Sequence, residues 1–182
     1  MSTQTKQEIP AGTYRVDPIH SSIGFAVIHN ELSPFRSTFQ AYDVTLTGGE
    51  QPSLEGTVEV SSIAISEEML KGHVLSPDFF DAEKYPQVRF TSTEFDVADD
   101  GSVRLRGKLD LHGTQHDVEA SGKFARLGAD LGGSSRVGFS LATSIDRREF
   151  GLDWNAELPS GGQVLDNRVE IAVELELVAE AE

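Results

Sequence analysis

Hydrophobic and polar residues alternate along much of the chain. In segment 102–113, valine and leucine at odd positions alternate with arginine, lysine and aspartate at even positions. Segments 135–145 and 167–180 repeat this period of two. Because successive side chains of a β-strand point to opposite faces, each segment predicts a strand with one dry face and one wet face.

Weaker alternation predicts further strands at 14–17, 22–29, 39–46, 54–65, 88–97 and 118–124. Short runs rich in Gly, Asp and Ser separate many of them and predict turns. Successive strands joined by short turns favour antiparallel pairing. Eight or nine strands are enough to close a barrel, which leaves no exposed sheet edge. We therefore expect an all-β fold with an antiparallel barrel.

Two segments interrupt the alternation. Ser66 is a plausible helix N-cap, and Ser76 followed by Pro77 repeats such a start signal. These signals predict two short helices before Pro86, packed near one end of the barrel. The second interruption, residues 146–167, predicts a loop of about twenty residues, a length typical of functional or mobile loops.

The strand at 22–29 raises the question of what its apolar face contacts. Ile23, Phe25 and Val27 share one face, while the other face carries mostly small residues. The interior of an eight-stranded barrel is either filled by side chains or holds one small ligand. Small residues also interrupt the predicted inward rows at Ser92, Gly107 and Thr143, which favours a container.

The length of 182 residues suits one domain. We expect a flexible N-terminal tail at 1–12, a single barrel domain at 13–179 and a C-terminal tail at 180–182. The formal net charge is −15, from 15 basic and 30 acidic residues. Such an acidic chain repels phosphate backbones and anionic lipid headgroups, so we expect no nucleic-acid partner and no polybasic membrane docking.

The chain has no cysteine, which excludes disulfides and thiolate chemistry. No run approaches 18 apolar residues, so we expect no stable membrane insertion. The N-terminal residues lack the apolar core of a secretory signal, which predicts a cytoplasmic location.

Candidate chemical groups are few. His112 and His116 flank a short turn, but no third ligand is evident, so we expect a solvated hairpin end and no metal site. Arg147 lies where an apolar strand meets the long loop. It could hold the anionic head of a ligand, or equally form an ion pair with one of the many acidic residues.

Four stretches carry a family resemblance. They are YRVDPIHSSIGFAVIH, LSPDFFDAEKYPQVRFTST, GKLDLHGTQHDV and IDRREFGLDWN, and they fall in one order between about Tyr14 and Leu177. Together they resemble the YceI-like proteins, a polyisoprenoid-binding or lipid-binding family.

The resemblance implies an extended, lipocalin-like antiparallel barrel of eight strands with short helices packed near one end. It implies non-enzymatic binding, storage or transport of a long isoprenoid or fatty-acyl chain, with no cofactor other than such a lipid. Members are often dimeric, so the resemblance also allows a homodimer. Two alternatives stay open: a lipid-modifying enzyme that uses His20, His29 or Arg147, and a protein-interaction barrel with a packed interior.

On this interpretation the inward rows line a lipid channel. We predict that its wall comprises Ile23, Phe25, Val27, Phe39, Phe90, Leu105, Gly107, Leu109, Phe139 and Leu141. We expect Gly107 in particular to border empty or ligand-filled space. We predict that the channel mouth and headgroup site comprise His20, His29, Arg36, His73 and Arg147.

Overall fold

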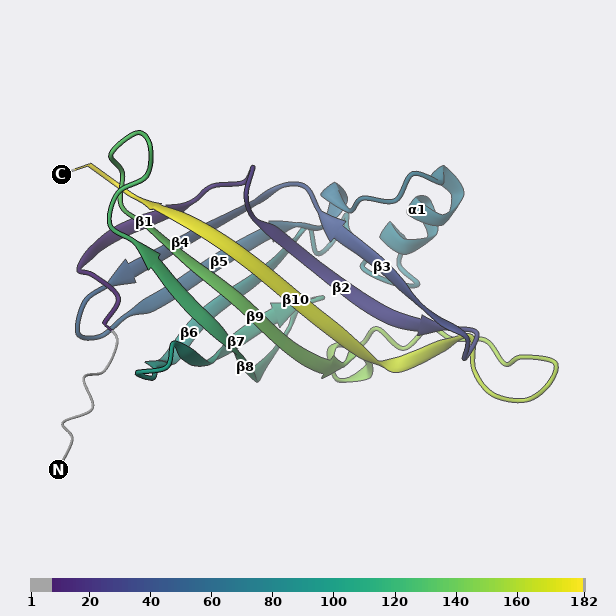
Figure 1. The fold of residues 1–182 in the computed structure, drawn as a ribbon. Helices are drawn as coiled ribbons and strands as arrows, with labels where there is room; N and C mark the ends of the chain where they lie inside the picture. The colour runs from purple at the N-terminus through teal and green to yellow at the C-terminus, as the bar shows by residue number, and fades with distance from the viewer. Residues whose placement is uncertain (1–7, 182) are drawn as a thin grey trace, which may run out of the picture.

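A closed ring of eight antiparallel strands forms the body of the protein in the computed structural model, which describes residues 8–181 (Figure 1). The strand order is β1-β4-β5-β6-β7-β8-β9-β10, and pairing of β1 with β10 closes the ring. The expected all-β barrel of eight strands is thereby confirmed. The ring strands are β1 (Gly12–Val16), β4 (Tyr42–Gly48), β5 (Ser53–Glu59), β6 (Gln87–Val97), β7 (Ser102–Leu111), β8 (Thr114–Leu127), β9 (Arg136–Asp146) and β10 (Leu165–Ala179).

A hairpin of two more strands, β2 (Ser22–His29) and β3 (Ser33–Phe39), extends the sheet beyond the ring. Strands β1 and β2 follow one another along β10, and β3 pairs with β2. The prediction of one strand at 39–46 was wrong, because Phe39 ends β3 and Tyr42 begins β4. The alternation of apolar residues continues through the turn between β3 and β4, so the pattern gives no sign of the turn.

One short helix, α1 (Glu68–Leu75), lies beside β3 and the start of β6. Its N-cap is Glu67, not Ser66: the Glu67 carboxylate accepts from the backbone N–H groups of Met69 and Leu70. The second predicted helix does not form. The N–H of Asp81 returns to the carbonyl of Ser76, and Asp81 takes a φ of 47°, which ends a helical path. Two 3₁₀ turns, η1 (Val60–Ser62) and η2 (Arg147–Phe150), complete the fold.

One half of the barrel is tightly packed. Tyr14, Leu46 and Leu177 are at most 2% exposed and belong to one hydrophobic cluster. Ile9, also 2% exposed, joins this cluster, so the packed region begins inside the segment predicted as a flexible tail. Residues 1–7 and 182, which complete the two predicted tails, lie outside the described residues.

The wall opens between β8 and β9 in the other half. These strands pair from Ser121–Ala142 to Leu127–Arg136. Residues 114–120 of β8 pair only with β7, and residues 143–146 of β9 pair only with β10. A side-chain bond from Thr143 Oγ1 to the carbonyl of Glu119, 2.7 Å long, still links the two strands.

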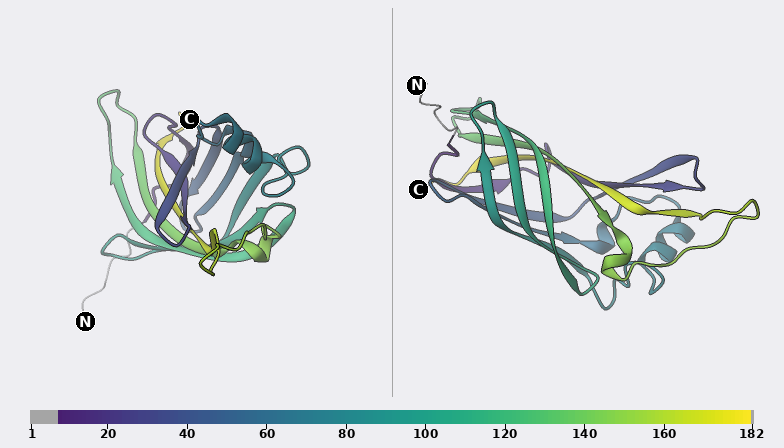
Figure 2. Two further views of the ribbon diagram at one scale, coloured as in Figure 1. Left: turned by 90° about the vertical axis from the view of Figure 1, so that its right-hand side faces the viewer. Right: turned by 90° about the horizontal axis from the view of Figure 1, so that it is seen from below.

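The β2–β3 hairpin, α1 and the loop before β10 project at the same end of the barrel (Figure 2). The first and last described residues, 8 and 181, lie at the opposite end (Figure 1). Within residues 8–181, no helix combines the length and apolar character needed to cross a bilayer.

Candidate ligand cavity

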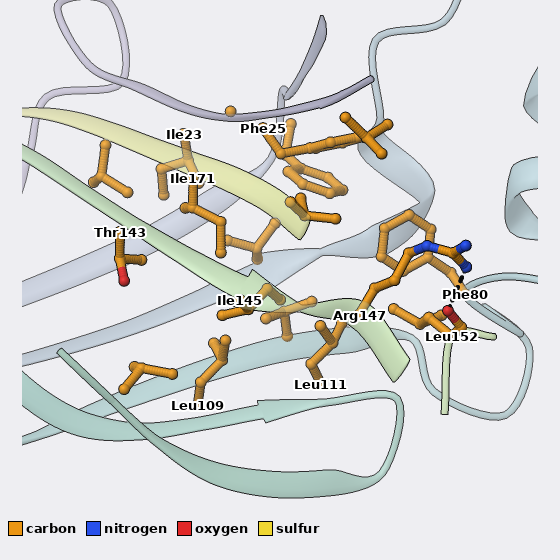
Figure 3. Close-up of a pocket in the computed structure, with 18 of the residues that line it drawn as sticks. Ile23, Phe25, Phe80, Leu109, Leu111, Thr143, Ile145, Arg147, Leu152 and Ile171 are labelled. Atoms are coloured by element: carbon orange, nitrogen blue, oxygen red, sulfur yellow. Dashed lines mark hydrogen bonds between the residues drawn. The ribbon is translucent and has the colours of Figure 1, made fainter. Parts of the chain in front are cut away.

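A cavity of about 770 Å³ occupies the half of the barrel beyond the packed cluster. Its volume falls within the range of about 300–1,000 Å³ that is usual for small-molecule sites. Strands from most of the barrel turn apolar side chains into it, among them Ile23, Leu109, Ile145 and Ile171 (Figure 3). The cavity extends to the end framed by the hairpin, α1 and the loop before β10, because residues of all three line it.

The residue types explain why one half is filled and the other is hollow. In the packed half Phe139 reaches Phe95 and Phe124, with ring centroids 5.5 and 5.2 Å apart. In the hollow half, aliphatic side chains shorter than phenylalanine supply much of the wall on β9 and β10. Phe25 and Phe39 instead stack on each other at 5.9 Å, along the side that α1 covers.

Most of the predicted wall residues line the cavity. The structure places them on β2, β3, β6, β7 and β9, with their side chains directed to the same space. These residues are Ile23, Phe25, Val27, Phe39, Phe90, Leu105, Leu109 and Leu141.

Gly107 and Phe139 do not line the cavity, and both predictions are corrected. A β-carbon on Gly107 would lie 2.5 Å from Cζ of Phe90 and would also meet the backbone of Thr91. The Phe90 ring already occupies the space above the glycine, opposite a bulge in β6. Phe139 is 3% exposed and belongs to the packed cluster.

Of the predicted mouth residues, His29, His73 and Arg147 line the cavity. His73 packs edge-on against the rings of Phe79 and Trp154, at centroid distances of 5.0 and 5.1 Å, and these two rings also contact each other. Its Nε2 lies 3.2 Å from Oδ2 of Asp78. These contacts join α1 and the segment after it to the loop before β10.

His20 and Arg36 lie away from the cavity lining. Arg36 is exposed on β3. His20 lies 2.9 Å from Asp17, whose carboxylate raises the pKa of the imidazole. Asp17, His20 and Glu176 bring possible metal-ligand atoms within 4.8 Å of one another, but Arg136 already donates to both carboxylates. We assign this group to an ion-pair network.

Arg147 is 4% exposed and anchors the loop before β10. Its Nη1 donates to the carbonyls of Leu152 and Trp154 at 2.6 and 2.8 Å, and its Nε donates to the carbonyl of Asp166 at 2.9 Å. Burial lowers the pKa of the guanidinium. Within residues 8–181 Arg147 forms no direct salt bridge; backbone carbonyls solvate its guanidinium, and Asp146, Asp153 and Asp166 lie near enough to interact with its charge.

The arrangement of Arg147 leaves little of it for a ligand. Three of its five N–H groups bind carbonyls at short distance, and Nη2 reaches Oδ1 of Asn167 at 3.4 Å. A headgroup contact by Arg147 stays a prediction. Any such contact would use the Nη2 side of the guanidinium.

The two hairpin histidines contact η2: His116 is exposed, as predicted for a solvated hairpin end, whereas His112 is half-buried. Nδ1 of His112 lies 3.0 Å from the carbonyl of Phe150, and Nε2 of His116 lies 2.9 Å from that of Glu149. His112 and Gly113 both have positive φ, as a two-residue type I′ turn requires. The two imidazoles therefore tie the β7–β8 hairpin to the turn that follows β9.

Some wall residues were absent from the predicted set. Phe80, Leu152, Trp154 and Ile171 all line the cavity. Ile171 lies on an alternating strand and could have been found from its parity. Phe80, Leu152 and Trp154 lie in irregular segments, where no period reports which side chains point inward.

Comparison with protein families gives a match over nearly the whole chain. Residues 14–177 match the YceI-like domain. A UPF0312 protein of Photorhabdus laumondii is 30% identical over 167 residues, which cover 88% of this chain and 85% of the relative. A UPF0312 protein of Staphylococcus epidermidis is 29% identical over 168 residues, covering 90% of this chain and 95% of the relative.

Solved structures share the fold. BcnA of Burkholderia cenocepacia superimposes with a TM-score of 0.77 at 22% identity, covering 88% of this chain and 98% of that chain. A polyisoprenoid-binding domain of Saccharophagus degradans gives a TM-score of 0.72 at 16% identity, covering 92% and 98%. With the family match over residues 14–177, these findings show that the chain belongs to the YceI-like family.

Proposed function

We propose that the protein binds a long-chain apolar lipid, of isoprenoid or fatty-acyl type, in this cavity and stores or transports it unchanged. The observation that carries the proposal is the cavity of about 770 Å³ with an almost wholly apolar wall. Apolar side chains around a space of this size cannot contact one another across it, and a hydrocarbon ligand would supply the dispersion contacts that they lack.

The chemistry of the wall favours a hydrocarbon chain over a polar metabolite. Each buried methylene group stabilises a complex by about 0.8 kcal/mol, so a long chain needs few polar contacts to bind tightly. Polar lining groups such as His29, Ser33 and His73 lie on the hairpin and α1, at the open end of the cavity. This arrangement suits a ligand with an apolar tail inside and a polar end near the mouth.

The comparisons support the same ligand class. The domain of Saccharophagus degradans with this fold is described as polyisoprenoid-binding. An isoprenoid is branched and wide, and the lack of β8–β9 pairing beside residues 114–120 would leave the hollow half free to fit such a chain.

Catalysis on the lipid is the alternative, and one observation favours it. His73 and Asp78 form a hydrogen-bonded pair next to the cavity, as a general base and its orienting carboxylate would. However, the cavity lining within the described residues contains no aspartate or glutamate. We therefore favour binding without reaction.

Organic extraction of natively purified protein followed by mass spectrometry tests the proposal. We expect a co-purifying long-chain lipid, and incubation of the protein with that lipid should return it unchanged. A chemically altered lipid would support the enzyme. Absence of any lipid, with no binding of added polyprenol or fatty acid, would contradict the proposal.

Neighbouring positions on β8 offer a matched pair of variants. Ala120 lines the cavity, whereas Ser121, the next residue, is exposed on the outer face. Ala120→Trp should reduce the lipid recovered by about tenfold or more, since overpacking costs roughly 1–3 kcal/mol. Ser121→Trp adds the same side chain outside and should leave recovery unchanged. Equal losses in both variants would mean that the strand was disturbed.

A further inference from the structure

The apolar surface continues from the cavity onto the outside of the protein. Leu32, at the tip of the β2–β3 hairpin, is 84% exposed, and Met69, in the first turn of α1, is 82% exposed. Leu70, beside Met69, is 39% exposed and also lines the cavity. We call Leu32, Met69 and Leu70 the rim. Its two elements project at the same end of the barrel in Figure 1 and in the right-hand view of Figure 2.

Packing within the protein does not explain why apolar side chains occupy the exposed rim positions. Helix α1 has no buried residue, and Val74 and Leu75 provide its contact with the hydrophobic cluster. Ser33 and Pro34, which follow Leu32, line the cavity. Side chains at the rim are thus placed where a lipid would enter or leave.

The charges around the rim limit what it can contact. The hairpin turn at 30–32, α1 with its N-cap, and the loop at 151–164 carry one lysine, Lys71, and five carboxylates. The carboxylates are Glu31, Glu67, Glu68, Asp153 and Glu157. Such a border repels anionic lipids, whereas exposed leucine and methionine side chains can enter the interface of a bilayer without net charge.

We propose that the rim docks on the surface of a zwitterionic or uncharged lipid bilayer, so that lipid passes between bilayer and cavity without crossing water. The inference rests on the proposed lipid-binding function. The continuity of the rim with the cavity identifies lipid as the occupant of this surface, and the acidic border sets its headgroup class.

Flotation with vesicles tests the inference. The full chain is mixed with vesicles of pure phosphatidylcholine, or with vesicles containing phosphatidylglycerol. We expect binding to the first and weaker binding to the second, with a difference that shrinks at high salt. The affinity of the variant Leu32→Ser/Met69→Ser for phosphatidylcholine vesicles should fall by about tenfold or more. Each substitution removes an apolar side chain that would be buried in the bilayer interface.

A matched control uses equally exposed apolar residues elsewhere. Ile19 is 84% exposed and Leu131 is fully exposed, and neither lines the cavity. Ile19→Ser/Leu131→Ser should bind vesicles as the unchanged chain does. Equal binding by the rim variant, or no binding by the unchanged chain, would overturn the inference. A dimer that becomes monomeric in the rim variant, with vesicle binding unaltered, would assign the rim to a second copy and also overturn it.

The same samples separate this inference from the proposed function. The rim variant should still yield co-purified lipid on extraction, because its cavity wall is intact, but should exchange that lipid with vesicles more slowly. A chain that contains lipid yet never binds vesicles refutes the docking alone. A chain that neither contains nor binds lipid refutes the proposed function as well.

Discussion

Strand β10 runs through two regions of the barrel that differ in what they enclose. At its C-terminal part, Leu177 is 0% exposed in the packed half, and Leu175, 4% exposed, stands at the boundary between this cluster and the cavity. At its N-terminal part, Val169, Ile171 and Val173 have the same parity but are only half-buried, and they line the cavity. The alternation is the same in both regions. It sets which side chains face inward, whereas the distance to the opposite wall decides whether they fill the interior.

The neighbours of β10 account for the difference in width. In the packed half, β1 lies between β10 and β4 and closes a complete ring. In the hollow half, β2 takes the place of β1, and β3 and α1 follow in place of β4. There β8 also loses its pairing with β9. The wall of the hollow half is therefore longer around, and side chains of ordinary size leave its centre empty.

The largest expected effect compares the same truncation in the two halves. Leu46→Ala removes a side chain that is 0% exposed in the packed cluster and should destabilise the protein by about 2–5 kcal/mol. Leu109→Ala removes a side chain that lines the cavity, so fewer contacts are lost, and we expect about half that cost or less. Chemical denaturation of lipid-free protein measures both. Equal costs would show that the hollow half is filled.

A second comparison uses two glycines. Gly107→Ala should destabilise the protein by about 1–3 kcal/mol, because its β-carbon meets the Phe90 ring at 2.5 Å. Gly56 lines the cavity, and its β-carbon would meet Val44 at 3.6 Å, an ordinary contact. Gly56→Ala should be neutral or stabilise slightly. Thermal melts of both variants provide the measurement, and tolerance of alanine at 107 would restore the original expectation of space there.

A third prediction concerns the closure of the hollow half. Arg147→Lys keeps the charge but loses the Nη1 group that donates to the carbonyls of Leu152 and Trp154, so we expect a loss of stability of about 1–2 kcal/mol. Limited proteolysis should then cut the loop at 151–164 sooner. The affinity for lipids should fall by a similar factor whether their headgroups are anionic or neutral. A selective loss for anionic lipids would instead make Arg147 a headgroup contact.

The smallest effect concerns acid stability. Hydrogen bonds from Arg148 lower the pKa of Asp146 to about 2, below its ordinary value of 3.8. Because the folded-state pKa is depressed, this carboxylate stabilises the fold fully above about pH 4, and the contribution is lost as the pH falls toward 2. Asp146→Asn should cost under about 1 kcal/mol at pH 7. Denaturation curves for the two proteins should converge between pH 4 and 2, and a constant difference would exclude this linkage.

Parity along the strands predicted most of the cavity wall, and irregular segments account for what it missed. Ile23, Phe25 and Leu109 followed from alternation, because a strand reports its two faces locally. Gly107 was misread because the space above it depends on the rotamer of Phe90 on the next strand. The anchoring role of Arg147 depends on carbonyls of residues 152–166, whose path no local pattern encodes.

In the helical segment, too, the local sequence did not determine the structure. Ser66 and Ser76 both resemble N-caps, yet Glu67 caps the helix that forms and the second helix is absent. The start of a helix is uncertain by one or two residues when it is predicted from sequence. The structure of the flanking chain decides which of the neighbouring polar residues caps it. The barrel was predictable because the same alternation recurs in many strands, so an error in one strand does not change the fold.

The separation of β8 from β9 has a mechanical consequence. A closed barrel resists expansion because its strand pairs form an unbroken hoop of hydrogen bonds. In the hollow half that hoop is interrupted beside residues 114–120, where the bond from Thr143 to the Glu119 carbonyl crosses the gap. The ring of strand pairs is thus weakest there and beside β3, the last strand of the sheet, so we expect the hollow half to widen more readily than the packed half. Such a container would adapt its width to its contents while the packed half keeps its shape.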